Sequence, residues 1–236
     1  MVARQWDAHI TVLHVRIDDQ RAQAVRTLFN STMASLGVPI GEASPGGGAS
    51  MASFGWLTSR EADQLPQQAR LSDLIVVPHP EAGDDASSSD ALHAVLFDSG
   101  RPVLIAPRVV PRSIGTRICI GWNGTAESSS AVYVLMPWLK RAEVVRILSA
   151  EGYQRRGPAA AELAEYLSLH GVEADWVMFP PVGGVVGAGL LAAAQQFDAD
   201  LLAMGAYSHS RWRQMILGGV TRHVLANATL PVIMNR

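Results

Sequence analysis

The sequence predicts an α/β fold made of two tandem open parallel-sheet domains. Short runs rich in Val, Ile and Leu alternate with longer amphipathic segments, an order typical of parallel strands joined by helices. Apolar residues make up 48% of the 236-residue chain and charged residues 17%, which provides ample material for a core. Related segments also recur roughly 130 residues apart, a period that suits two copies of one domain.

Three pairs of segments define the repeat. They are residues 10–15 with 143–149, 72–78 with 199–205, and 99–108 with 228–236. We therefore predict a first domain at residues 1–108, a linker at 109–116 and a second domain at 117–236.

The second copy shows the alternation clearly. We predict strands at residues 116–122, 143–150, 173–179, 200–205 and 230–235, and helices at 123–139, 157–171, 187–199 and 219–228. Thr125 is the expected N-cap of the first of these helices. Pro158 near the start and Gly171 at the end bracket the second.

The first copy begins later in the same order. Its first predicted strand, residues 9–15, corresponds to the second strand of the second copy. We therefore expect a first domain truncated at its N-terminus, a strand supplied by something else, or a misplaced start codon. Residues 41–56 are Gly- and Ser-rich and predict a long loop, whereas residues 83–100 predict a helix.

Composition excludes several classes of function. A net charge of −2 gives no basic field for nucleic acid. Lys140 is the single lysine, so no glycine cluster can be a Lys-bearing phosphate loop. The N-terminus lacks a signal-peptide core, and residues 182–194 are too short to span a bilayer. These features predict a cytoplasmic protein without a membrane partner.

One cysteine, Cys119, lies in an apolar run. A single thiol cannot form an internal disulfide, which fits a reducing compartment. Its apolar surroundings predict a buried, inert thiol and not a nucleophile.

Two loops of the second copy leave the carboxyl ends of strands, where open parallel sheets bind ligands. One is residues 121–125, and the other begins at Gly205 and holds the pair Gly218 and Gly219. Backbone N–H groups of such a glycine pair at a helix start can bind phosphate.

The spacing of Gly205, Ser208 and Gly218, together with residues 122–131 and 223–234, resembles the universal stress protein family. The resemblance covers the second copy and the first copy from its second strand onward. It implies a tandem member with a Rossmann-like, adenine nucleotide alpha hydrolase-like fold that binds ATP, with or without Mg²⁺. The residues it implies for binding are Gly121, Asn123, Gly205, Ser208, Gly218, Gly219, Val220 and Thr221.

Three of these residues depart from the family pattern. Ser208 stands where a glycine is usual, Gly219 where Ser or Thr is usual, and Asn123 where Asp is frequent. Gly219 keeps a backbone donor but loses a hydroxyl worth about 0.5–1.5 kcal/mol, which Thr221 could replace. Asn123 keeps one acceptor but weakens metal ligation.

The same residues also have simpler explanations. The glycines could serve only as turn and helix-start residues without a ligand. Arg211, Arg213 and Arg222 could contact phosphate, but such arginines are more often solvated or paired. His209 has no acid in its loop to orient it as a base and is more often a surface residue. The cluster at residues 183–189 lacks dinucleotide-motif spacing and predicts a loop and helix start.

The first copy has a different loop at the matching place. The long-spaced glycine pattern is absent there, and three acids, Glu81, Asp84 and Asp85, follow the strand. Carboxylates repel phosphate, so we expect the first copy to be architectural and to bind no nucleotide.

The final strands of the two copies are apolar, and exposed apolar edges recruit a partner strand. We expect residues 101–107 and 230–235 to pair within the chain as a pseudo-dimer, and two chains could associate further. No nucleophile–base set and no metal-ligand cluster is apparent in the sequence. The leading hypothesis is therefore a stress-response protein that binds ATP or a related nucleotide in the second copy and acts through partners. The alternatives are a ligand-free interaction or dimerisation module of the same fold, and a slow ATP hydrolase.

Overall fold

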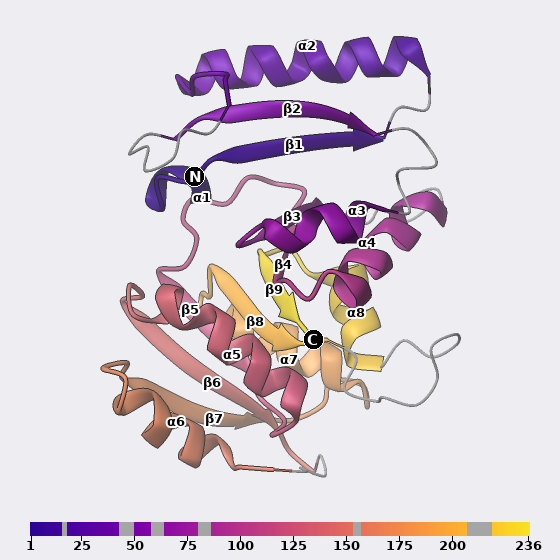
Figure 1. Cartoon of the computed structure of the whole chain (residues 1–236). Coiled ribbons are helices and arrows are strands. Elements are labelled where there is room, and N and C mark those ends of the chain that lie inside the picture. The colour runs from indigo at the N-terminus through magenta and orange to yellow at the C-terminus, as the bar shows by residue number, and fades with distance from the viewer. Residues whose placement is uncertain (16–17, 43–49, 58–63, 80–85, 153–156, 207–218) are drawn as a thin grey trace. The chain divides into compact units, whose positions relative to one another are not determined.

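The computed structural model describes the chain except for residues 16–17, 43–49, 58–63, 80–85, 153–156 and 207–218. It divides into two compact units, Met1–Leu65 and Pro66–Arg236 (Figure 1). No helix among the described residues is long and apolar enough to cross a membrane.

The first unit contains a two-stranded parallel sheet. Its elements are α1 (Val2–Gln5), β1 (Ile10–Val15), α2 (Asp19–Leu36) and β2 (Ala52–Leu57). The pairing begins with Ile10 opposite Ala52. Asp18 caps α2 by accepting from the backbone N–H of Arg21, and Gly37 ends the helix in the left-handed conformation that glycine favours.

Strand β2 corrects the prediction of a continuous loop at residues 41–56. Ala52, at its start, is fully buried in a cluster with Phe29, Met33 and Val38, against which Phe54 packs. The Gly- and Ser-rich composition of this stretch hid the strand, because its stability comes from apolar contacts with α2 and from pairing with β1. Residues 43–49 of the expected loop lie outside the described residues.

The second unit contains a seven-stranded sheet in the order β3-β4-β9-β8-β5-β6-β7. Its strands are β3 (Ile75–Pro78), β4 (Val103–Ala106), β5 (Arg117–Gly121), β6 (Val144–Ala150), β7 (Ala174–Phe179), β8 (Leu201–Gly205) and β9 (Val232–Asn235). Neighbouring strands are parallel except β4 and β9, which are antiparallel. The α/β fold with predominantly parallel sheets is thus confirmed.

Helices connect these strands. They are α3 (Leu65–Gln68), followed by the 3₁₀ turn η2 (Ala69–Leu71), then α4 (Ala86–Asp98), α5 (Ala126–Leu139), α6 (Ala160–Ser168), α7 (Val186–Gln196) and α8 (Gly219–Asn227). Parallel strands require right-handed crossovers, which place α5 and α6 on one face and α7 and α8 on the other. Figure 1 shows α5 in front of the sheet and α7 behind it. The predicted strand and helix order of the second copy is confirmed, and Thr125 caps α5 as expected.

The internal repeat is visible in the hydrogen bonds of matched strands. Ile75 N–H donates to Pro102 O at 3.0 Å, and the matched Leu202 N–H donates to Pro231 O at 3.0 Å. At the other end of these strands, His79 N–H donates to Ala106 O, and Ala206 N–H donates to Asn235 O. Two copies of one strand pair are therefore present.

The expected pairing of the two final strands occurs within the chain. Val103 lies opposite Met234 and Ile105 opposite Val232 in the antiparallel pair of β4 and β9. This pairing places β3 and β4 in the sheet of the second copy, so packing divides the chain at residue 65. Sequence repetition and packing are different criteria, and the domain boundaries at 108 and 117 stay a prediction.

Cys119 lies in the middle of the sheet. Its side chain is fully buried on β5, between Leu202 of β8 and Arg146 of β6 in the pairing. Burial raises the pKa of this thiol to about 12, and the cysteine is free. The prediction of a buried, unreactive thiol agrees with this environment.

Candidate functional site

The strand order reverses between β5 and β8. From β5 the chain proceeds through β6 to β7, and it then crosses back to β8 and β9. The carboxyl ends of β5 and β8 lie side by side, with Gly121 opposite Met204 in the pairing. Open α/β sheets bind ligands at this reversal, and the crossover helices begin at the same edge. Gly121, Asn123 and Gly205 are therefore brought to one edge of the sheet.

Asn123 shapes the turn between β5 and α5. Its Oδ1 accepts from the backbone N–H of Thr125 at 3.2 Å and from the Thr125 hydroxyl at 2.9 Å. Thr125 Oγ1 in turn accepts from Ser128 N–H at 3.4 Å, which caps α5. The side-chain oxygen of Asn123 thus already accepts hydrogen bonds within a local turn, and this role needs no ligand.

Gly205 lies directly against the first turn of α5. A Cβ placed on Gly205 would lie 2.5 Å from Ser128 N and 2.6 Å from the carbonyl carbon of Glu127. Both are backbone atoms, so no side chain could move aside to make room. Close packing between β8 and α5 therefore explains this glycine without a ligand.

A second contact joins the loops that follow β5 and β6. A Cβ on Gly157 would lie 2.0 Å from Gly124 O, so these two loops touch through backbone atoms. The indole Nε1 of Trp122 also donates to Pro158 O at 2.9 Å. These contacts hold the β5–α5 loop against the start of α6 and close that side of the crevice.

The start of α8 is less crowded by the described residues. None of their atoms lies within 4 Å of a Cβ placed on Gly219, which begins α8. Because α8 connects the parallel strands β8 and β9, its N-terminus lies at the carboxyl edge of the sheet. Thr221, in the first turn, is buried. The first turn of this nine-residue helix thus has backbone N–H groups beside space that the described residues leave unfilled, and the helix dipole there favours an anion.

Several predicted residues fall in the stretch before α8. Ser208 and Gly218 lie outside the described residues, as do Arg211, Arg213 and His209. Arg222, on α8, is exposed. In the first copy, Glu81, Asp84 and Asp85 also lie outside the described part of the chain.

Sequence reasoning missed Asn235, at the carboxyl end of β9. Its side chain is 5% exposed and its Nδ2 donates to Ser130 Oγ on α5 at 2.7 Å. Asn235 is paired with Gly205 across β8 and β9, so it lies at the same edge. Its Oδ1 is buried and finds no hydrogen-bond partner among the described residues. The one available signal was a polar residue ending an apolar strand.

The glycine cluster at residues 183–189 has a packing role. Gly183 and Gly184 form the turn before α7 with positive φ, as the loop-and-helix-start interpretation predicted. A Cβ on Gly187 would lie 2.7 Å from His223 Cβ, and one on Gly189 would lie 2.3 Å from Pro180 O. Small residues here let α7 pack tightly on α8 and on the end of β7.

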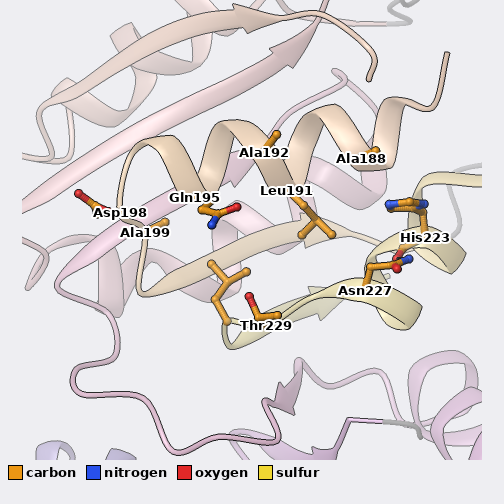
Figure 2. Close-up of a pocket in the computed structure, with 10 residues that line it drawn as sticks. Ala188, Leu191, Ala192, Gln195, Asp198, Ala199, His223, Asn227 and Thr229 are labelled. Atoms are coloured by element: carbon orange, nitrogen blue, oxygen red, sulfur yellow. The ribbon is translucent and has the colours of Figure 1, made fainter. Parts of the chain in front are cut away.

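A groove runs along α7 and the later part of α8 (Figure 2). Its lining residues are Ala188, Leu191, Ala192, Gln195, Asp198, Ala199, His223, Asn227, Thr229 and Leu230. The residues at 198–199 and 229–230 precede β8 and β9, so the groove extends toward the amino edge of the sheet. It shares no lining residue with the crevice formed by Gly121, Asn123 and Gly205.

Ionisable side chains do not gather into a catalytic or metal centre in the described ranges. No group of three or more His, Cys, Asp or Glu side chains there could hold a metal ion. The crevice thus offers backbone amides, hydroxyls and carboxamides. Such groups can bind a polar or anionic ligand.

Comparisons with known proteins agree with this architecture. A sequence model described as the universal stress protein family matches residues 127–236. A solved universal stress protein from Archaeoglobus fulgidus is similar in fold, with a TM-score of 0.70 and 17% identity over 97% of this chain and 85% of that chain. A structure titled putative universal stress protein, from Pseudomonas aeruginosa, has a TM-score of 0.58 and 15% identity over 99% of this chain and 84% of its own. A comparison with curated protein sequences found no match.

Proposed function

We propose that residues 127–236, which match the model of the universal stress protein family, bind ATP or a related nucleotide. The site is the carboxyl edge between β5 and β8, and the bound nucleotide changes how the protein associates with partners in a cytoplasmic stress response. The observation that carries the proposal is the first turn of α8, which the described residues leave uncovered at Gly219, beside the point where the strand order reverses.

The chain's own residues have distinct roles in this proposal. Backbone N–H groups of Gly219, Val220 and Thr221 face the phosphates, as free amides of a first helical turn do. Gly121 and Asn123, at the end of β5, lie beside the sugar. Ser208 and Gly218 lie outside the described residues, and only the motif spacing assigns them to this site.

Magnesium would arrive with the nucleotide, since the described residues offer no cluster of acids to hold it alone. Its chemistry there would be charge neutralisation of the phosphates. The amide of Asn123 is a weaker ligand than a carboxylate, and its oxygen already accepts from Thr125. We therefore propose a site in which the protein contacts the nucleotide chiefly through backbone amides.

The test begins with the purified protein. It is denatured without added nucleotide, and released ATP, ADP or AMP is measured by mass spectrometry. Calorimetric titration with ATP and magnesium then compares the parent with Gly219→Val. Because no atom of the described residues lies near the added side chain, this variant should fold normally but fill the space proposed for phosphate.

The matched control is Ala226→Val, which adds the same bulk to an exposed position of the same helix. The proposal predicts one nucleotide per chain for the parent and the control, and at least about tenfold weaker binding for Gly219→Val. No bound nucleotide and no heat at millimolar ATP would exclude a nucleotide site.

A second candidate function is a ligand-free interaction module of the same fold. Two observations favour it: the engagement of Asn123 by Thr125 and the backbone contact between Gly124 and Gly157. Both edges of β9 are already paired with β4 and β8, so association of two chains would need another surface. Sedimentation with and without ATP separates the candidates, because a ligand-free module would associate equally in both.

A slow hydrolase remains the third candidate. Phosphate release from ATP that disappears in Gly219→Val but persists in Ala226→Val would support hydrolysis at this site. Phosphate release at the same rate in both variants would indicate a contaminant.

A further inference from the structure

We propose that the outer edge of β3 binds an extended apolar segment of a partner polypeptide. This segment pairs with β3 in parallel and is similar in sequence to β5. This proposal is independent of nucleotide binding. It rests on the match between β3 and β8, which have the same place in the two copies.

The two strands match residue by residue but differ in their neighbours. Ile75 pairs with Val103 as Leu202 pairs with Val232, and Pro78 pairs with Ala106 as Gly205 pairs with Asn235. On its other side β8 pairs with β5. Strand β3 ends the seven-stranded sheet, and no strand of the first copy, among its described residues, takes the place of β5.

Apolar side chains of β3 are more exposed than their counterparts in β8, which share the face of the sheet that Gly205 turns toward α5. Ala203, in the middle of β8, is fully buried, whereas the matched Val76 is 58% exposed. Leu201 is also fully buried, whereas the matched Leu74 is only half-buried. A large apolar side chain on an unpaired strand is a recognised site for strand addition.

The backbone fixes where such a strand can pair. Ile75 and His79 donate their N–H groups toward β4, so the N–H of Val76 points to the opposite, outer side. Pro78 has no N–H to offer on that side. Pairing is therefore restricted to the first half of β3, and the added strand is short.

Asp73 supplies the second recognition element. The matched Asp200 accepts from the backbone N–H groups of Gly115, Thr116 and Arg117 at 2.9–3.1 Å, and so anchors the segment that leads into β5. Asp73 is exposed and precedes β3 as Asp200 precedes β8. Its carboxylate can accept the same N–H groups from an incoming chain.

These features define the chemistry of the partner segment. Small or unbranched residues must precede the strand, so that their N–H groups reach Asp73. Uncharged β-branched residues must follow, to pair along the edge beside Val76. An acidic segment is excluded by repulsion from Asp73.

The test uses a synthetic peptide of this chain's residues 113–122 as the probe, with C119S to prevent oxidation and a fluorescent label at its N-terminus. Fluorescence anisotropy follows its titration with the full-length protein. We expect saturable binding that weakens at least about tenfold with Asp73→Ala. Asp98→Ala, an exposed aspartate at the end of α4, is the matched control and should bind as the parent does.

A second probe carries C119P in place of C119S, which removes a ladder donor from the peptide. We expect it to bind at least about tenfold more weakly than the first probe. Absence of saturable binding at millimolar protein would overturn the proposal. Binding that survives both Asp73→Ala and the proline probe would also overturn it, because it would not involve strand pairing at this edge.

Discussion

Strands β3 and β8 have the same position in the two copies of the repeat, but β3 ends the sheet and β8 lies within it. Their pairing with β4 and β9 has the same register. What differs is the other side, where β8 has β5 as a neighbour. Leu201 also lies on the same face of the sheet as Gly205, which packs against α5. The surroundings of the strand, and not its own sequence, thus decide whether Leu201 or its counterpart Leu74 belongs to the core.

The comparison also separates ligand chemistry from architecture. The features that could hold a nucleotide, namely the end of β5, Gly205 and the start of α8, all belong to the second copy. The first copy contributes β3 and β4, which extend the second copy's sheet through the antiparallel pair with β9. The part of the first copy that lies in this sheet is thus the part that joins the two copies.

The largest expected effect comes from removing a matched leucine. Leu201→Ala should destabilise the protein by about 3–4 kcal/mol, because it leaves a cavity in the core. Leu74→Ala should cost less than about 1.5 kcal/mol, because its half-buried site can be filled by solvent. Urea unfolding of both variants measures the difference. Equal losses would mean that the edge of β3 is as well covered as β8.

The matched aspartates should differ next most. Asp200→Ala leaves three backbone N–H groups without their carboxylate and should cost about 2–3 kcal/mol. Asp73→Ala should change the free energy of unfolding by less than about 0.5 kcal/mol, since its side chain is exposed. Thermal unfolding compares the two. A large loss for Asp73→Ala would contradict a carboxylate that awaits a partner segment.

The residues that end the two strands provide a third pair. Gly205→Ala should cost about 1–3 kcal/mol, because its methyl group meets backbone atoms of Glu127 and Ser128. Pro78→Ala, at the matching place, should cost less than about 1 kcal/mol. If Gly205→Ala has the same free energy of unfolding as the parent but no longer binds nucleotide, the glycine serves the ligand and not the packing of α5.

Much of the second copy was predictable from the sequence because its signals are local. Apolar runs of strand length and caps such as Thr125 and Gly171 set the element boundaries within a few residues. The repeat also predicted the pairing of the two final strands, since both end in an apolar edge that needs a partner.

Other features depended on tertiary neighbours and could not be predicted in this way. The strand β2 is Gly- and Ser-containing, and its packing on Phe29 together with its pairing with β1 makes it a strand. The engagement of Asn123 by Thr125 and the burial of Asn235 beside Ser130 are side-chain contacts that no spacing reveals. The match to a family motif identified candidate residues, but Gly205 shows that a motif glycine can also be required by packing.

The smallest expected effect concerns β5 itself, the strand without a counterpart in the described first copy. Burial raises the pKa of the Cys119 thiol from 9.0 to about 12. The unfolded chain therefore loses this proton at lower pH than the folded protein. The stabilising contribution is complete below pH 9 and is lost as the pH rises toward 12.

At about pH 10 the loss should reach about 1.4 kcal/mol, and Cys119→Ala should not show it. Urea unfolding of the parent and this variant at about pH 8 and about pH 10 isolates the thiol, because every other group titrates in both proteins. Alkylation by iodoacetamide provides an independent measurement and should be slow in the folded parent. Rapid alkylation, or equal losses for the two proteins, would mean that β5 leaves its place between β6 and β8. The two copies would then differ less than their structures indicate, because β8, like β3, would have an unpaired edge.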